Sequence, residues 1–161
     1  MASGTGRTLT AEEQLIRAFM MGVHTLFVDH LSDEVTVGSV DPEQFDASDV
    51  IGTITFDGAM VGDVKVRFPR EAARAIIGKY TGLGDVPDAI FGDGVGELCN
   101  VIIGRAKSSI SGEYVKISPP SVDTGPAPSR IEEGTKQVAC DTSFGRIWIL
   151  FSARQAGRAA A

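Results

Sequence analysis

The sequence has few residues that could crosslink the chain or hold a metal ion. Its 161 residues include two cysteines, Cys99 and Cys140, and two histidines, His24 and His30. The cysteines lie far apart and form no CxxC pair, so neither a disulfide framework nor a zinc site is expected. Free thiols in a reducing compartment are the simpler interpretation.

Positive charge and long apolar runs are also scarce. The 15 Lys and Arg residues are outnumbered by 21 Asp and Glu residues, which gives a formal net charge of −6 and a pI near 4.9. Such an acidic chain is repelled by nucleic acid and by anionic membranes. No stretch reaches the roughly 18 apolar residues that a membrane helix needs, and the N-terminal stretch lacks the apolar core of a signal peptide. We therefore expect a cytoplasmic protein with no nucleic-acid partner and no membrane insertion.

What is present is the composition of a folded domain. Hydrophobic residues make up 43% of the chain and charged residues 22%, and the length suits one domain with its own core. We expect a flexible N-terminus over residues 1–9, the domain over 10–153 and a flexible C-terminal tail over 154–161.

Apolar periodicity divides the domain into helices and hairpins. The expected elements are, in chain order, a helix (10–31), a strand (34–38), a hairpin (51–68), two helices (69–80 and 86–111), a strand (114–117), a Pro-rich loop (118–128) and a second hairpin (137–151). This order predicts an α+β fold, in which helices pack on an antiparallel sheet built from two pseudo-repeated helix-and-hairpin halves.

The helix expected over 86–111 carries a polar ridge, opposite its apolar residues. At about 100° per residue, an arc of about 60° contains Asp93, Glu97, Asn100 and Gly104. Asn100 is the only asparagine in the chain, and asparagine is a poor mid-helix residue because its side chain competes for the backbone. The pattern alone leaves two interpretations open: a functional site, or a solvated polar face in which Gly104 permits close helix packing.

The segment GDGVGELCNVIIGRAKSSI resembles the signature helix of the CheC/CheX/FliY chemotaxis phosphatases. In that family an acidic residue or Ser is followed four residues later by Glu, and three further on by Asn. Asp93, Glu97 and Asn100 match these positions, and Gly104 matches a glycine that follows. The segments ASDVIGTITFDGAMVGDVKVRFP and GEYVKISPPSVDTG also resemble the family, and the resemblance covers about residues 10–153. Because the first helix has no Glu-x-x-Asn, the chain is identified as a single-site, CheX-like member with a CheC-like fold.

The resemblance implies a protein phosphatase that hydrolyses the aspartyl phosphate of a CheY-like receiver domain. Asn100 would position the attacking water, and Glu97 would pair with a lysine of the receiver. Asp93 and Gly104 would contact this partner. The chain would need no metal and no cofactor of its own, because the phosphorylated receiver carries Mg²⁺. The alternative is a non-catalytic module on the same fold, which binds a receiver or serves as a flagellar-switch scaffold.

The second hairpin contains an unbroken apolar run, Ile-Trp-Ile-Leu-Phe, at residues 147–151. A strand that is apolar on both faces must be covered on both faces. The run therefore predicts a two-fold homodimer in which strands meet across the interface, as the resemblance to CheX also implies. In the alternative, helices 10–31 and 86–111 cover the run within one chain.

Overall fold

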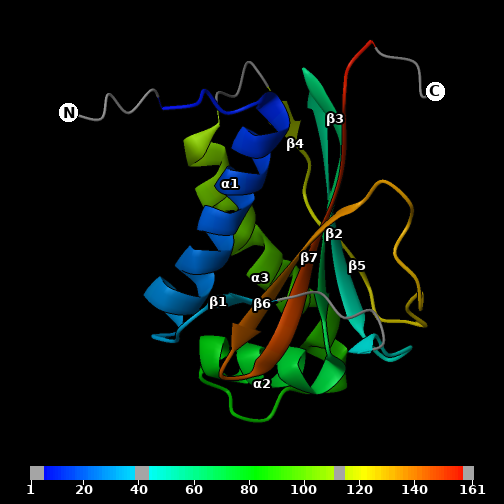
Figure 1. Ribbon diagram of the computed structural model, residues 1–161. Helices are drawn as coiled ribbons and strands as arrows, with labels where there is room; N and C mark the ends of the chain where they lie inside the picture. Colours follow the sequence, from blue (N-terminus) through cyan, green and yellow to red (C-terminus); the bar gives the residue numbers. More distant parts are fainter. Residues whose placement is uncertain (1–5, 39–43, 111–114, 158–161) are drawn as a thin grey trace.

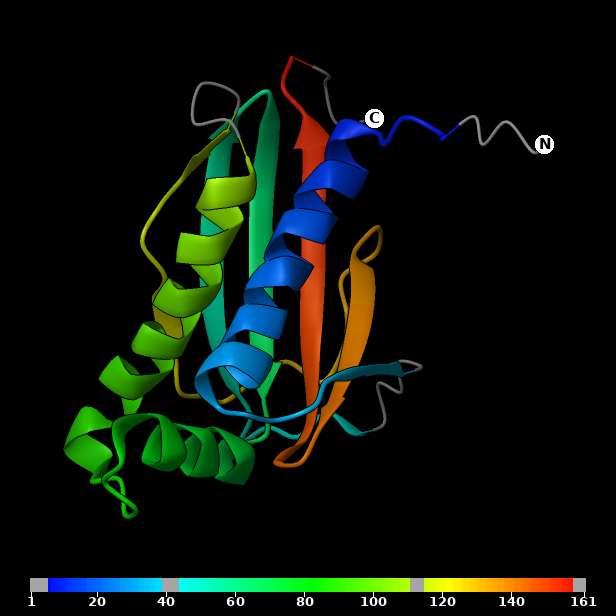
Figure 2. The same cartoon turned by 90° about the vertical axis from the view of Figure 1, so that its left-hand side faces the viewer.

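The computed structural model describes residues 6–38, 44–110 and 115–157 (Figure 1). Two long helices lie side by side on one face of a sheet, and a third helix crosses the end of the sheet (Figures 1 and 2). The helices are α1 (Ala11–His24), continued by the π-helix η1 (Thr25–His30), α2 (Arg70–Thr81) and α3 (Asp88–Ser109). The strands are β1 (Thr36–Gly38), β2 (Val50–Gly58), β3 (Met60–Phe68), β4 (Val115–Ile117), β5 (Ser121–Asp123), β6 (Lys136–Thr142) and β7 (Gly145–Gln155). The α+β class predicted from the sequence is confirmed.

The sheet joins the two halves of the chain. Within the described residues its seven strands follow the order β1-β6-β7-β3-β2-β4, with β5 also paired to β2, and all pairings are antiparallel. The two hairpins meet where β3 pairs with β7. Each of the strands β1 and β4 pairs with the hairpin of the other half, β1 with β6 and β4 with β2. This exchange ties the pseudo-repeated halves into one sheet.

Local sequence explains where the helices begin and end. The Thr10 hydroxyl caps α1 by accepting a hydrogen bond from the backbone N–H of Glu13 at 3.1 Å. Pro69 precedes α2, and Gly82 ends it with φ 73°, a left-handed conformation that glycine adopts without strain. Pro87 precedes α3. No helix in the described part of the chain is long and apolar enough to cross a bilayer.

The apolar run of β7 is covered on both faces within one chain. Ile147, Ile149 and Phe151 are buried in the core beneath the helices. On the opposite face the cover is a smaller apolar cluster, which consists of Ala139, Trp148 and Leu150, with Phe45 and Ile131 packed against it. The prediction that this run needs a second chain to cover it is therefore wrong. The long helices cover only one face of the run. The segments before β2 and β6 cover the other face.

Two parts of the sheet were not expected. β5 lies in the Pro-rich stretch that was interpreted as a loop, yet Gly52 and Val122 are register partners of β2 and β5. β7 ends at Gln155, opposite Met60 of β3, so the strand continues past the boundary expected at residue 153. Both pairings use the backbone of mostly polar residues, which leave no apolar signal in the sequence. The outermost parts of the expected flexible ends, 1–5 and 158–161, lie outside the described residues.

A buried ion pair holds the segment after β5 on the outer face of the sheet. Arg67 of β3 donates to the Asp49 carboxylate at 2.7 Å, and both side chains are 2% exposed. The same guanidinium donates to the carbonyl of Pro128 at 2.6 Å, and Arg70 donates to the carbonyl of Thr124. These bonds hold the chain on either side of 125–127, and so help to keep β5 paired with β2.

Candidate functional site

α3 packs closely on both α1 and the sheet. A methyl group at Gly22 of α1 would overlap the carbonyl oxygen of Ile102, and one at Gly52 of β2 would overlap the sulfur of Cys99. The buried stripe of α3 consists of Phe91, Val95, Leu98, Cys99, Ile102, Ile103 and Ala106. Because this stripe and the two close contacts determine the rotation of the helix, the opposite side of α3 is held toward solvent.

The polar ridge lies on that solvent side. The structure brings all four of its predicted members to one exposed surface: Asp93, Glu97, Asn100 and Gly104. At a rise of 1.5 Å per residue, they span about 16 Å along α3, and Glu97 and Asn100 are separated by about 4.5 Å of rise. The periodicity argument is confirmed for the orientation of the ridge.

The glycines of α3 have different surroundings. A methyl group at Gly94 would lie 2.8 Å from the side chain of Ile77 in α2, so Gly94 permits the packing of two helices. At Gly104, apart from its chain neighbours and the adjacent backbone of α3, no atom of the described residues lies within 4 Å of the corresponding position. The interpretation that Gly104 permits helix packing is therefore wrong. Its missing side chain instead leaves open space beside Asn100.

The polar groups of the ridge have no bonded partner in the described part of the chain. Among the described residues no hydrogen bond or ion pair engages Asp93, Glu97 or Asn100. Asp88, at the start of the same helix, is by contrast paired with Arg74 at 3.0 Å. An unpaired carboxylate can bind a cationic side chain, and an unpaired carboxamide can donate and accept hydrogen bonds at the same time. Glu97 and Asn100 together can therefore hold a cation and a water molecule side by side.

Comparison with protein families assigns the chain. The family described as "Chemotaxis phosphatase CheX" matches residues 50–143, more than half of the 161 residues. The chain belongs to the CheX family. The matched part runs from β2 to the turn after β6 and contains the whole polar ridge. None of the curated protein sequences matches the chain significantly.

Solved structures of CheX proteins share this fold. CheX from Vibrio vulnificus superposes with a TM-score of 0.72 at 19% identity, covering 91% of this chain and 100% of that one. CheX from Desulfovibrio desulfuricans gives 0.70 at 22% identity, covering 88% and 99%. A structure of the CheX–CheY–BeF₃–Mg²⁺ complex from Borrelia burgdorferi gives 0.65 at 16% identity, covering 88% and 98%. The predicted family and CheC-like architecture are confirmed.

One exposed residue beside the ridge does not follow from the polar pattern of the sequence. Ile90 lies seven residues before Glu97, which is two helical turns, and its exposed fraction is 37%. The heptad spacing would have placed it on the ridge. Because Ile90 is apolar, a pattern of polar residues does not include it.

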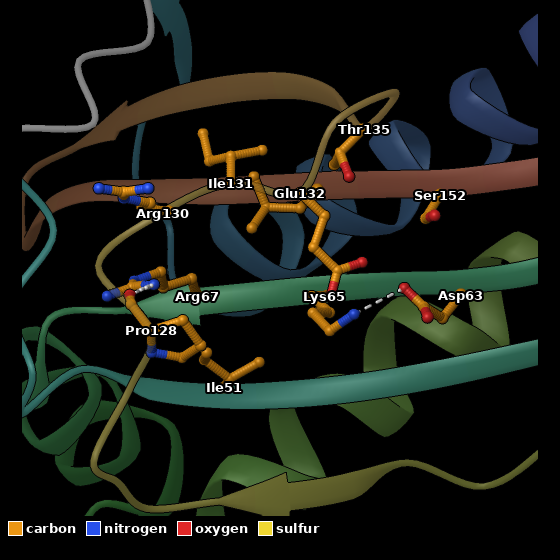
Figure 3. A pocket seen from close by; sticks show the side chains of 11 residues that line it. Ile51, Asp63, Lys65, Arg67, Pro128, Arg130, Ile131, Glu132, Thr135 and Ser152 are labelled. Carbon is orange, nitrogen blue, oxygen red and sulfur yellow. Dashed lines mark hydrogen bonds and ion pairs between the residues drawn. The ribbon is translucent and has the colours of Figure 1, made fainter.

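A small cavity lies on the other face of the sheet, away from the ridge (Figure 3). It has a volume of about 90 Å³ and lies between the outer face of β2, β3 and β7 and the segment 128–135. Lys65 and Asp63 form an ion pair of 3.0 Å in its wall. The sheet separates this cavity from α3, so the cavity is not part of the polar ridge. Within the described residues, no group of three or more His, Cys, Asp or Glu could hold a metal ion.

Proposed function

We propose that this CheX-family protein hydrolyses the aspartyl phosphate of a CheY-like receiver domain in the cytoplasm. The observation that carries the proposal is the exposed pair of Glu97 and Asn100 on α3, which has no partner within the described residues, in a chain of this family. The CheX–CheY complex from B. burgdorferi, whose CheX chain shares this fold, supports a receiver as the partner.

The reaction requires little covalent chemistry from the phosphatase. A water oxygen attacks phosphorus as the bond to the aspartyl oxygen breaks, which releases inorganic phosphate and restores the carboxylate of the receiver. Positioning of the water in line with the breaking bond therefore dominates the rate. The Asn100 carboxamide oxygen accepts a hydrogen bond from this water, while its NH₂ group remains free to donate to the receiver.

Glu97 docks the helix. Its carboxylate pairs with a lysine of the receiver, and this charge-assisted contact places Asn100 above the phosphorus atom. Asp93 contacts the rim of the receiver site one turn earlier. The open space at Gly104 admits the receiver surface one turn after Asn100. Mg²⁺ belongs to the phosphorylated receiver, and no cofactor of this chain takes part.

The test is phosphate release from a panel of phosphorylated receivers encoded in the same genome. We expect this protein to accelerate release from at least one of them beyond the receiver's own rate. A receiver that binds this protein but keeps its phosphate at the uncatalysed rate would favour the alternative, a non-catalytic receiver-binding or flagellar-switch scaffold module.

We also propose that the protein is a homodimer, with each α3 ridge facing its own receiver. The covered run of β7 no longer supports this assembly, and the family resemblance is its remaining basis. Light scattering at micromolar concentration tests it, because the chain has a mass of 17.0 kDa and a dimer has twice that mass. A mass near that of one chain refutes the dimer without affecting the phosphatase proposal.

A further inference from the structure

Ile90 is an exposed apolar residue that takes no part in the core packing of the described residues. It belongs to neither of the two apolar clusters of the described residues and is not among the side chains packed against them. Only two other large apolar side chains in the described part of the chain are exposed, Val37 and Leu83, and neither lies on α3. Every other large apolar residue of α3 is buried or packs against the core.

The position of Ile90 connects it to the polar ridge. At 100° per residue it lies about 20° around the helix from Glu97, and about 10 Å nearer the start of α3. A stable protein interface buries about 800 Å² on each partner, so a surface that docks on Glu97 and Asn100 must extend well beyond those two residues. A domain-sized partner lying along the ridge therefore also covers Ile90.

Resting on the proposed function, we infer that Ile90 is a further docking contact for the receiver and fits an apolar side chain on the receiver's surface. An ion pair that stays open to water contributes little affinity, because water and salt screen it, so the Glu97 contact is strong only where neighbouring contacts exclude water. Interfaces that bind specifically combine such polar contacts with an apolar anchor that excludes water around them. Ile90 is the exposed apolar residue that α3 offers for this purpose.

The experiment measures the affinity of Ile90→Ser for receivers activated with beryllofluoride and Mg²⁺. We expect the Kd to rise about tenfold, while kcat at saturating receiver stays unchanged because Ile90 does not reach the phosphate. Ile90→Leu, which keeps the apolar surface, retains the parent's affinity. Leu83→Ser is the matched control, since Leu83 is 56% exposed but lies outside α3, and its Kd stays within twofold. Circular dichroism confirms the folding of each variant.

The outcomes separate this inference from the proposed function. If Ile90→Ser binds like the parent while Glu97→Ala binds weakly, the contact at Ile90 is refuted and the docking mode of the ridge stands. If Ile90→Ser weakens binding but the parent releases no phosphate from any receiver, the contact stands and the phosphatase proposal fails. Equal losses in Ile90→Ser and Leu83→Ser would also overturn the inference, because the effect would not be specific to the ridge.

Discussion

α1 and α3 lie side by side on the same face of the sheet, yet they present different chemistry to solvent (Figure 2). Each buries an apolar stripe at helical spacing against the same core. The exposed residues of α1 include Gln14, Arg17 and His24. α3 exposes the polar ridge, with two carboxylates, the only asparagine of the chain and a glycine with open space around it. Packing on the core requires an apolar stripe in both helices. A difference in function between them therefore depends on their exposed residues.

The largest expected difference between α3 and α1 is in the effect on kcat of removing an exposed carboxamide. Asn100→Ala should lower kcat about 100-fold or more, because the attacking water is no longer held in line. Folding and receiver affinity should be nearly unchanged, since the side chain is exposed and has no partner among the residues that the structure describes. Gln14→Ala, which removes an exposed amide from α1, should leave kcat at the parent value. Phosphate release at saturating receiver measures both, and normal turnover by a folded Asn100→Ala protein would contradict the mechanism.

Glu97 should affect affinity more than turnover. Charge-assisted hydrogen bonds contribute about 1.5–3 kcal/mol, so Glu97→Ala should raise the Kd for the activated receiver by about 10- to 100-fold. Glu97→Gln should keep the shape of the side chain and still lose much of the affinity. Arg17→Ala on α1 serves as the control with a charge removed from the other helix. Titrations in low and high salt should show the difference shrinking as salt rises. If both Glu97 variants bind like the parent, this residue is only a solvated helix position.

Two glycines, one on each helix, should respond in opposite directions. Gly22→Ala should lower the free energy of unfolding by about 1–3 kcal/mol, because the new methyl meets the backbone of Ile102 in α3. Gly104→Ala should raise it by up to about 1 kcal/mol, since alanine is the better helix former and the space is open. The added methyl at Gly104 should nevertheless weaken receiver binding. Urea denaturation and receiver titration measure the two effects, and unchanged affinity in Gly104→Ala would show that the partner does not use this space.

The smallest expected difference is in the labelling rates of two buried thiols, Cys99 of α3 and Cys140 of β6 in the sheet beneath it. Burial raises the pKa of the Cys99 thiol to about 12, and burial together with nearby Asp141 raises that of Cys140 to about 11. Because the thiolate is the reactive form, both thiols should resist a thiol reagent at pH 8 in the folded protein. Their labelling rates in increasing urea should follow global unfolding together. Earlier labelling of Cys99 would mean that α3 detaches before the sheet opens.

Sequence reasoning was most successful where the signal was local. The helices α1, α2 and α3 and both hairpins follow from apolar spacing and turn residues within single segments, and the outward orientation of Asn100 follows from the same spacing. Local sequence did not predict β5, because its pairing with β2 depends on backbone groups that are far apart in the chain. It also failed for the outer face of Trp148 and Leu150, because Phe45 and Ile131 reach that face from distant segments.

The sequence by itself determined the composition of the polar ridge and the side of α3 on which it lies, because helical periodicity depends only on neighbouring residues. Only the tertiary structure decided that Gly94 contacts Ile77 while Gly104 faces open space, although both are helical glycines. It likewise decided that the apolar run of β7 is covered within one chain and that Ile90 is left uncovered on the ridge. These outcomes depend on which distant segments come together, and a one-dimensional pattern does not contain that information.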